Sequence, residues 1–356
     1  MSLLETLRRR IAHDGPMSVA DYMSECLLNP TQGYYTTQTA IGATGDFITA
    51  PEISQMFGEL LGLALAQAWR DQGEPSAFAL AELGPGRGTL MADMLRATRG
   101  LPGFHAAMDL VLIEASPKMR ALQAEALSAY APRWLDRVED LPQKPLFLVA
   151  NEFFDALPLR QFIRTGAMWS ERRVGLDDHQ NLAFGLGAPT AQPALAHRLE
   201  DTREGDLVEY SEIASVVTET IAQRIATHGG AALIVDYGDW RSLGDTLQAL
   251  RAHAPADPLD TPGQADLTTH VDFEVLAQAA RAQGCAHTRL TPQGVFLERL
   301  GITARAQSLA APLDGDPLTA LIAAHRRLTH PEEMGNLFKV LGLMPETAPP
   351  PAGLEP

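Results

Sequence analysis

The sequence predicts an α/β fold with a doubly wound, mostly parallel sheet. Four short runs of apolar residues, each ended by polar or glycine residues, are typical of strands buried on both faces: FALAELG, DLVLIEA, LFLVANE and AALIVDYG. Helical patterns follow the first two runs, and this alternation favours parallel strands joined by crossover helices. Three glycines, Gly84, Gly86 and Gly88, stand between the first strand and its helix, as in Rossmann-like ligand sites.

The helices are predicted from their apolar spacing and their caps. Residues 52–69 carry an apolar stripe with helical period, and Thr49 with Glu52 suggests a capping box, with Pro51 in the first turn. A second helix is expected over 88–98, and Ser116 and Pro117 open a third.

The pattern changes in the second half of the chain. Residues 159–206 alternate like an antiparallel hairpin inserted into the core, with SERRVGLDDHQN as a polar hairpin tip or, equally, a solvated loop. GVFLERLG is expected to be a strand, and the proline-rich end a disordered tail. The predicted regions are an N-terminal helical part (1–72), a core (73–158 and 207–303), the insert (159–206), a C-terminal helical part (304–344) and the tail (345–356).

Composition excludes several classes of partner. The chain has 356 residues, 46% of them hydrophobic, and a formal charge of −16, so a sizeable core is expected and nucleic acid is not. Cys26 and Cys285 are the only cysteines, which fits a reducing compartment. We find no signal-peptide pattern, no apolar stretch long enough to insert into a bilayer and no metal-ligand spacing, and we expect a cytoplasmic protein.

The glycine loop, LAELGPGRGTL, limits what the site can hold. A nucleotide-triphosphate loop needs a lysine after its last glycine, and here Thr89 follows Gly88, so a triphosphate site is excluded. A dinucleotide fingerprint needs a glycine at its sixth place, and Thr89 stands there too, so an NAD site is disfavoured. Glu82, two residues before Gly84, would repel a pyrophosphate and attract a cation. S-adenosylmethionine carries an ammonium and a sulfonium and no phosphate. The alternative is an ordinary tight turn.

A second acidic residue supports this choice of cofactor. Glu114 ends the second strand, where a carboxylate can accept hydrogen bonds from both ribose hydroxyls; otherwise it caps a helix or lies at the surface. The predicted cofactor site therefore comprises Glu82, Gly84, Pro85, Gly86, Gly88, Glu114 and Asn151. The Asp236–Gly238 segment should reach the same rim, because the carboxyl ends of parallel strands meet there.

Three more stretches carry a family resemblance: GDFITAPEISQMFGELLG, VANEFFDALPLRQF and ADLTTHVDF. With the glycine loop, they make the chain, from about Met17 to Leu343, resemble the MidA family of class I methyltransferases, whose mitochondrial member assembles respiratory complex I. The resemblance implies a seven-stranded sheet and symmetric dimethylation of an arginine on the subunit that helps line the quinone pocket. The mitochondrial member carries a transit peptide that this chain does not show, so we expect a bacterial relative whose substrate can differ.

Methylation of an arginine needs carboxylates that hold the guanidinium. Glu152 and Asp155 are the first candidates, since a helical turn after their strand would place both on one face; otherwise Asp155 caps that turn and Glu152 faces solvent. Asn151 can present its carbonyl to the nucleophile or to the cofactor. Asp46, in a turn after Gly45, is the next candidate, with an ordinary turn as the alternative.

His270 completes the predicted catalytic set. It lies between Asp266 and Asp272 and can accept the proton that the substrate loses, or it can be structural. Glu52 is left out, because the capping box explains it. Two other functions stay open: a methyltransferase for the nitrogen or oxygen of a small molecule, and a non-catalytic chaperone that binds the cofactor. The insert favours a protein partner, and the oligomeric state, homodimer included, is left open.

Overall fold

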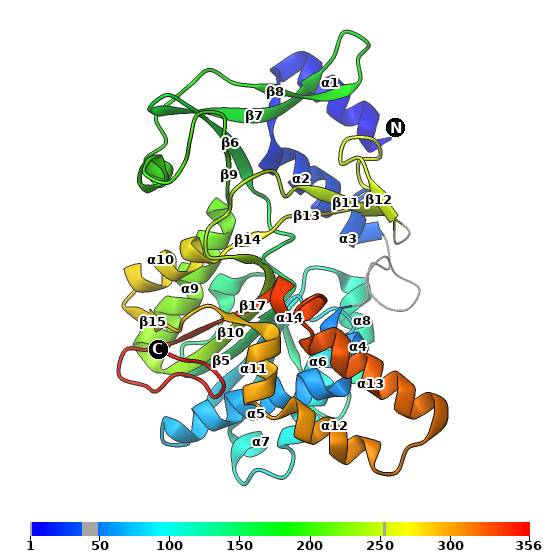
Figure 1. The fold of residues 1–356 in the computed structure, drawn as a ribbon, viewed down its shortest axis with the longest axis vertical. Coiled ribbons are helices and arrows are strands. Elements are labelled where there is room, and N and C mark those ends of the chain that lie inside the picture. The colour runs from blue at the N-terminus through cyan, green and yellow to red at the C-terminus, as the bar shows by residue number, and fades with distance from the viewer. Residues whose placement is uncertain (1, 38–48, 252–253) are drawn as a thin grey trace. The chain divides into compact units, whose positions relative to one another are not determined.

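The computed structural model describes residues 2–37, 49–251 and 254–356, which form two compact units (Figure 1). We call residues 48–154, 215–240 and 273–356 the sheet unit, and residues 1–47, 155–214 and 241–272 the insert unit. Helix α9 (Glu212–His228) begins in the insert unit and ends in the sheet unit. In the described part of the chain, no helix is both long and apolar enough to cross a bilayer.

The sheet unit is built on strands in the order β15-β17-β10-β5-β2-β3-β4. Their bounds are Cys285–His287, Phe338–Pro345, Gly230–Asp239, Leu146–Asn151, Phe78–Leu83, Met108–Ile113 and Arg133–Leu135. From β10 to β4 the neighbours are parallel, and β17 is antiparallel to both β10 and β15. The predicted doubly wound sheet is confirmed; seven strands run in this order within a sheet that has nine strands in all among the described residues. The strand order reverses between β2 and β5, the switch point at which open sheets bind ligands.

Apolar side chains close both faces of this sheet. The aromatic rings of Trp69, Phe78, Phe104 and Phe147 pack against one another with centroid distances of 5.0–6.0 Å, and all four are buried. The helices of the unit include α4 (Ala50–Ile53), α5 (Gln55–Asp71), α6 (Thr89–Thr98), α7 (Phe104–Ala107), α8 (Pro117–Ala126) and α10 (Phe273–Ala282). This packing fixes β2 and β5, whose ends carry the site.

The predicted helix over 52–69 is interrupted, and its predicted capping box is wrong. Helix α4 ends at Ile53 and α5 begins at Gln55, because the Ser54 hydroxyl caps α5 by accepting from the Met56 N–H at 3.2 Å. The Thr49 side chain makes no cap bond. The Glu52 carboxylate instead accepts a hydrogen bond from the Thr89 hydroxyl at 2.6 Å, at the start of α6.

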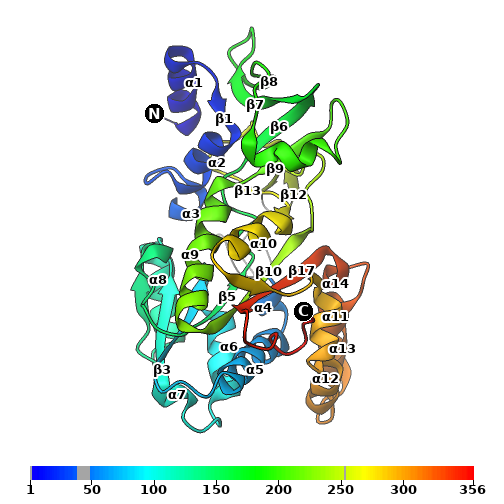
Figure 2. The ribbon, with the colours of Figure 1, turned by 90° about the vertical axis from the view of Figure 1, so that its left-hand side faces the viewer.

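GVFLERLG is a helix, contrary to the strand that the sequence favours. Helix α11 (Gln293–Arg299) buries the consecutive residues Phe296 and Leu297, a pattern that one helix face allows and an alternating strand does not. It follows β16 (Thr291–Pro292), which pairs with β17. Figure 2 shows α11 grouped with α12 (Ile302–Ala310), α13 (Gly315–Thr329) and α14 (Met334–Leu337) near β17.

The end of the chain is placed against this group, in place of the disordered tail that its composition favours. Leu354 is 7% exposed and belongs to the core of the sheet unit. The Glu355 carbonyl accepts from the Arg289 N–H at 2.9 Å, and its carboxylate pairs with Arg299 at 2.7 Å. Apolar burial of one leucine thus orders a proline-rich segment.

The insert unit contains an antiparallel sheet, as the alternation predicts. Its order is β1-β7-β6-β9, with β8 beside β7, and β13, β11 and β12 form a second sheet. The elements are α1 (Leu3–Asp14), β1 (Met17–Ser18), α2 (Val19–Leu28), α3 (Tyr34–Thr37), β6 (Arg160–Thr165), β7 (Met168–Leu176), β8 (Leu182–Leu186), the 3-10 helix η2 (Pro193–Leu199), β9 (Leu207–Tyr210), β11 (Gln248–Arg251), β12 (Ala254–Ala256), β13 (Asp266–Thr268) and β14 (Val271–Asp272). Only Asp177–Asn181 forms a polar tip; SERRVG belongs to β7.

Candidate active site

The glycine loop requires its glycines for conformational reasons. Gly84, Gly86 and Gly88 have φ of 57°, 52° and 83°, in the left-handed region that other residues adopt at a cost. The Gly84 N–H donates to the Ile113 carbonyl of β3 at 3.0 Å, and the Gly88 N–H closes the turn on the Pro85 carbonyl at 2.7 Å. The loop therefore runs from the end of β2 into α6 as a fixed turn.

Two buried oxygens lie at the switch point without a hydrogen-bond partner among the described residues. They are Oε2 of Glu82 on β2 and Oδ1 of Asn151 on β5, in side chains of residues only 3% and 8% exposed. Buried hydrogen-bond acceptors in folded proteins rarely lack a donor. Two such acceptors at a ligand-binding edge therefore indicate a ligand that donates hydrogen bonds or carries positive charge. Both residues were predicted to bind the cofactor.

The environment of Glu82 strengthens this interpretation. Burial, and after it the charge of the neighbouring Glu114, raises the pKa of Glu82 to about 8. A carboxyl group held this way is stabilised by any cation that reaches it. Two carboxyl groups and an unpaired amide oxygen suit the ammonium and sulfonium of S-adenosylmethionine and would repel a phosphate.

Glu114 is held in place by a buried glutamine that the sequence analysis missed. Gln123 of α8 is fully buried and donates from Nε2 both to the Gly86 carbonyl, at 2.8 Å, and to Oε2 of Glu114, at 3.1 Å. Its Oε1 accepts from the Trp134 indole at 2.8 Å. Gln123 thus ties the glycine loop to the predicted ribose acceptor. The signal was available: Gln123 lies four residues after Met119, on the buried face of α8.

The segment after β5 is shaped by Asp236, which the sequence places at the rim without a role. The Asp236 Oδ2 accepts from the backbone N–H groups of Phe153 and Phe154, at 3.2 and 3.0 Å, and its Oδ1 accepts from the Tyr237 N–H at 3.0 Å. Asp236 is fully buried. The turn that it closes holds Glu152 at a φ of 50°, a left-handed conformation that is uncommon outside glycine.

Glu152 is only partly buried but is hydrogen-bonded to the protein, and the predicted helical turn with Asp155 does not form. Oε1 of Glu152 accepts from the Asn151 amide and from the Ala50 N–H at the start of α4, both at 3.2 Å. No helix follows β5, because the chain turns away toward β6. Glu152 belongs to the sheet unit and Asp155 to the insert unit. Their catalytic roles stay predictions.

Within the insert unit, the backbone of Asp155 is joined to the motif that carries His270. The Asp155 carbonyl accepts from the N–H and the hydroxyl of Thr269, at 3.0 and 3.2 Å. The His270 N–H donates to the Thr246 hydroxyl at 2.8 Å, and that hydroxyl donates to the buried Glu209. Asp155 and His270, distant in sequence, therefore lie on adjoining segments of one unit.

The neighbouring carboxylate Asp266 is also paired. The Tyr35 hydroxyl donates to its Oδ1 at 2.8 Å. Burial and the nearby charges of Asp266 and Asp155 raise the pKa of Tyr35 well above its usual value, which keeps this donor protonated. Asp46, the remaining predicted catalytic residue, lies outside the described residues.

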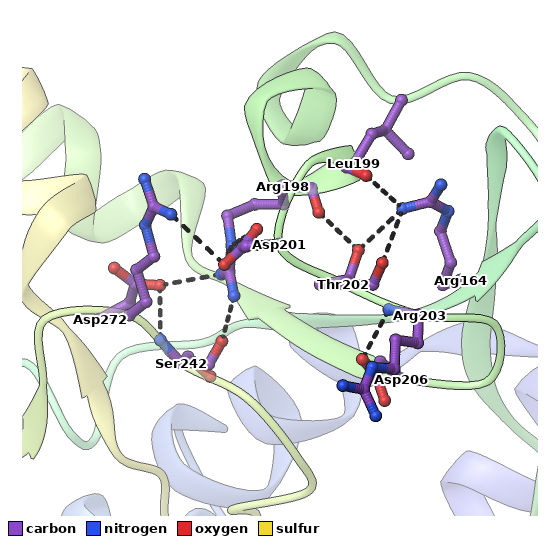
Figure 3. A network of polar contacts seen from close by, with 10 residues as sticks. Arg164, Arg198, Leu199, Asp201, Thr202, Arg203, Asp206, Ser242 and Asp272 are labelled. Atoms are coloured by element: carbon purple, nitrogen blue, oxygen red, sulfur yellow. Dashed lines mark hydrogen bonds and ion pairs between the residues drawn. The ribbon is translucent and has the colours of Figure 1, made fainter.

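A buried arginine fixes the other end of the His270 motif (Figure 3). Arg198 is 2% exposed and reaches Asp201 at 3.1 Å, the Ser242 carbonyl at 2.8 Å and Asp272 at 3.5 Å. Asp272 in turn accepts from the Ser242 N–H at 2.9 Å. A charge buried this deeply needs such pairing, and these contacts tie Asp201, Ser242 and Asp272 together.

Together, this strand order, the left-handed glycine turn after its first core strand and the unpaired acceptors at its switch point define a class I S-adenosylmethionine-dependent methyltransferase. A family model described as S-adenosyl-L-methionine-dependent methyltransferase matches residues 60–291. The chain belongs to this family.

Curated relatives cover nearly the whole chain. The protein arginine methyltransferase NDUFAF7 of Danio rerio is 38% identical over 96% of this chain and 87% of its own. The protein of the same name from Homo sapiens is 37% identical over 96% of this chain and 83% of its own. Both are described as mitochondrial.

A solved structure from Burkholderia thailandensis, bound to S-adenosyl-homocysteine, is 31% identical, with a TM-score of 0.83 over 96% of this chain and 91% of that one. A native structure from the same organism has a TM-score of 0.81 at 31% identity, over 96% of this chain and 91% of that one. The family model, the ligand in the similar solved structure and the chemistry of the site all indicate the same cofactor, S-adenosylmethionine.

Proposed function

We propose that this protein is a protein arginine N-methyltransferase that forms symmetric dimethylarginine. The observation that carries the proposal is the similarity, over 96% of the chain, to relatives named protein arginine methyltransferases. Fold alone would not choose the acceptor. Buried carboxyl groups among the predicted site residues add support, because a guanidinium is cationic and needs carboxylates to orient it.

The chemistry asks the protein mainly for positioning and for removal of a proton. S-adenosylmethionine, when bound, supplies a methyl group activated as a sulfonium. The acceptor nitrogen of arginine forms the new bond to this methyl carbon while the sulfur keeps the electrons of the broken bond, and the nitrogen gives up one proton. We propose that Glu152 orients the guanidinium, that Asn151 lends Oδ1 to the cofactor or the nucleophile, and that Asp155 and His270 keep the roles predicted from the sequence.

We further propose a cytoplasmic location and, as substrate, a subunit of respiratory complex I or a similar protein. The free, buried thiols of Cys26 and Cys285 support a reducing compartment. The substrate proposal rests on the resemblance to the complex I assembly factor among the MidA proteins.

Transfer of isotope-labelled methyl tests the proposal. Purified protein and labelled S-adenosylmethionine are added to a lysate of the source organism that lacks this gene, and labelled molecules are identified by mass spectrometry. We expect label as symmetric dimethylarginine in one protein. Label only in a metabolite would favour the hypothesis of a small-molecule methyltransferase instead. Cofactor binding without any label would favour the hypothesis of a non-catalytic chaperone.

Two variants make the result specific. Glu152→Gln should lower turnover by about 100-fold or more while the dissociation constant for the cofactor changes little, since a lost carboxylate removes orientation of the acceptor. Gly86→Val, at a φ of 52°, should abolish cofactor binding itself. Equal loss of binding in Glu152→Gln would move Glu152 to the cofactor site.

A further inference from the structure

One aromatic side chain of the sheet unit has no role in the site as described so far. Phe153 follows Glu152 and is only partly buried, whereas its neighbour Phe154 is 3% exposed and packs in the interior. The two rings meet edge to face, with centroids 5.4 Å apart and planes at 86°. A partly exposed phenylalanine at the ligand-binding edge of a sheet calls for an explanation.

The position of the ring is dictated by the turn that carries it. The N–H groups of Phe153 and Phe154 both donate to the Asp236 carboxylate, and Glu152 adopts the left-handed conformation that this turn requires. The Phe153 ring is thereby carried from β5 across to the glycine loop that follows β2. Backbone strain at a non-glycine residue persists only where the surroundings enforce it, and such positions are common at ligand clamps.

The ring meets the loop at Gly84 through its edge. A Cβ atom added at Gly84 would lie 3.0 Å from Cδ2 of Phe153 and 3.8 and 4.0 Å from Cε2 and Cγ. One close ring atom flanked by two more distant ones is the pattern of an approach in the ring plane, so Gly84 meets the edge of the ring and not its face. Gly84 is needed both for its φ of 57° and for this contact.

The ring contacts the segment that follows one unpaired acceptor and lies close in the chain to the other. Phe153 is two residues after Asn151, and it touches Gly84, which is two residues after Glu82. These acceptors mark where positive charge of the ligand is expected, and the face of an aromatic ring is negative. Phe153 therefore supplies the same kind of attraction without a hydrogen bond and without a titratable group.

We propose that Phe153 is a specificity-determining residue that uses its ring face to favour the positively charged cofactor over the neutral product. S-adenosylmethionine carries a sulfonium, and S-adenosylhomocysteine has a neutral thioether at the same place. A ring that attracts the sulfonium binds the first ligand more tightly and lets the second leave. The proposal does not depend on which acceptor is methylated, so it can fail while the arginine proposal stands.

The experiment measures dissociation constants by calorimetry, without turnover. Phe153→Leu is compared with the parent protein for S-adenosylmethionine, for sinefungin, which carries an amine in place of the sulfonium, and for S-adenosylhomocysteine. We expect the two cationic ligands to lose roughly 3- to 30-fold in affinity relative to the neutral one. Phe153→Tyr should keep the parent ratio. Equal weakening for all three ligands would show a packing role and overturn the proposal.

A second substitution guards against a change of shape. A trifluorinated phenylalanine at position 153 keeps the volume of the ring and removes most of the negative charge of its face, so it should lower the affinity for the cationic ligands alone. An unchanged ratio of dissociation constants would refute the proposal. Phe184→Leu, at a partly buried phenylalanine of the insert unit, serves as the matched control and should alter none of the three constants.

Discussion

Glu82 shows how a single residue couples the stability of the protein to its ligand. The pKa of its carboxyl group is raised to about 8 by burial and by Glu114. A group with a raised pKa in the folded state binds its proton more tightly there than in the unfolded chain. Such a carboxyl group therefore makes the ligand-free protein less stable as the pH rises from the unfolded value of Glu, about 4.3, toward 8.

Glu82→Gln should remove this dependence, because the amide is neutral at every pH. We expect the midpoint of thermal unfolding of the ligand-free variant to exceed that of the parent protein by roughly 3–8 °C at pH 8 and to match it near pH 4.5. Calorimetric scans across this range give the comparison. The same variant should bind S-adenosylmethionine at least about 10-fold more weakly. A stability difference that does not grow with pH would contradict the raised pKa.

Individual site residues could be predicted from the sequence where the residue type itself indicates a single structural property. Gly84, Gly86 and Gly88 were identified because a glycine cluster after a strand has few other uses. Gln123 was missed, since a glutamine is unremarkable in a helix until its burial is known. The pairing of Glu152 with Ala50 could not be predicted either, because Glu152 is positioned by a turn whose N–H groups bond to Asp236 on another strand.

Among the helices and strands, the start of α5 differs most clearly from its prediction. Thr49 and Glu52 satisfy the capping-box pattern, yet Ser54 is the residue that caps the long helix. The pattern describes only what a side chain can do locally, and the Thr89 hydroxyl offers Glu52 a better partner. Glu52, excluded from the site on the basis of its cap, thereby joins α4 to the first residue of α6.

Ser54→Ala should therefore destabilise the sheet unit, and Thr49→Ala should matter much less. Loss of an N-cap costs about 1 kcal/mol of unfolding free energy, whereas the Thr49 hydroxyl has no cap bond to lose. Urea unfolding of the two variants provides the measurement, with Ser54→Asp expected to restore most of the loss. The reverse ranking would mean that α4 and α5 form one helix capped at Thr49.

Strands were easier to predict than helix boundaries for a physical reason. β2, β3, β5 and β10 are buried on both faces, so nearly every residue must be apolar and the runs are unmistakable. The apolar run in GVFLERLG is shorter and fits the period of a helix as well as that of a strand. Only the burial of both Phe296 and Leu297 shows that it is a helix.

The whole molecule carries a charge of −16, and this affects the encounter with a basic substrate. Long-range attraction speeds association of oppositely charged partners and is screened by salt. For an arginine-rich acceptor peptide, we expect the association rate to fall about 10-fold or more between 20 and 300 mM salt. Stopped-flow binding gives this rate. Replacing the arginines by citrulline is the control and should nearly abolish the salt dependence; a rate insensitive to salt with the cationic peptide would contradict the expectation.

The place of β17 in the sheet has a consequence for how the protein is made. This strand lies between β10 and β15, pairing Ala232 with Leu343 on one side and Cys285 with Pro345 on the other. A ribosome delivers β15 before β17, so β15 cannot pair with β17 until that later strand has emerged. The nascent chain can assemble β2 to β10 early, but the edge of that partial sheet at β10 stays open. Closing it must wait until β17 has been synthesised, and until then the edge is exposed to association with other strands.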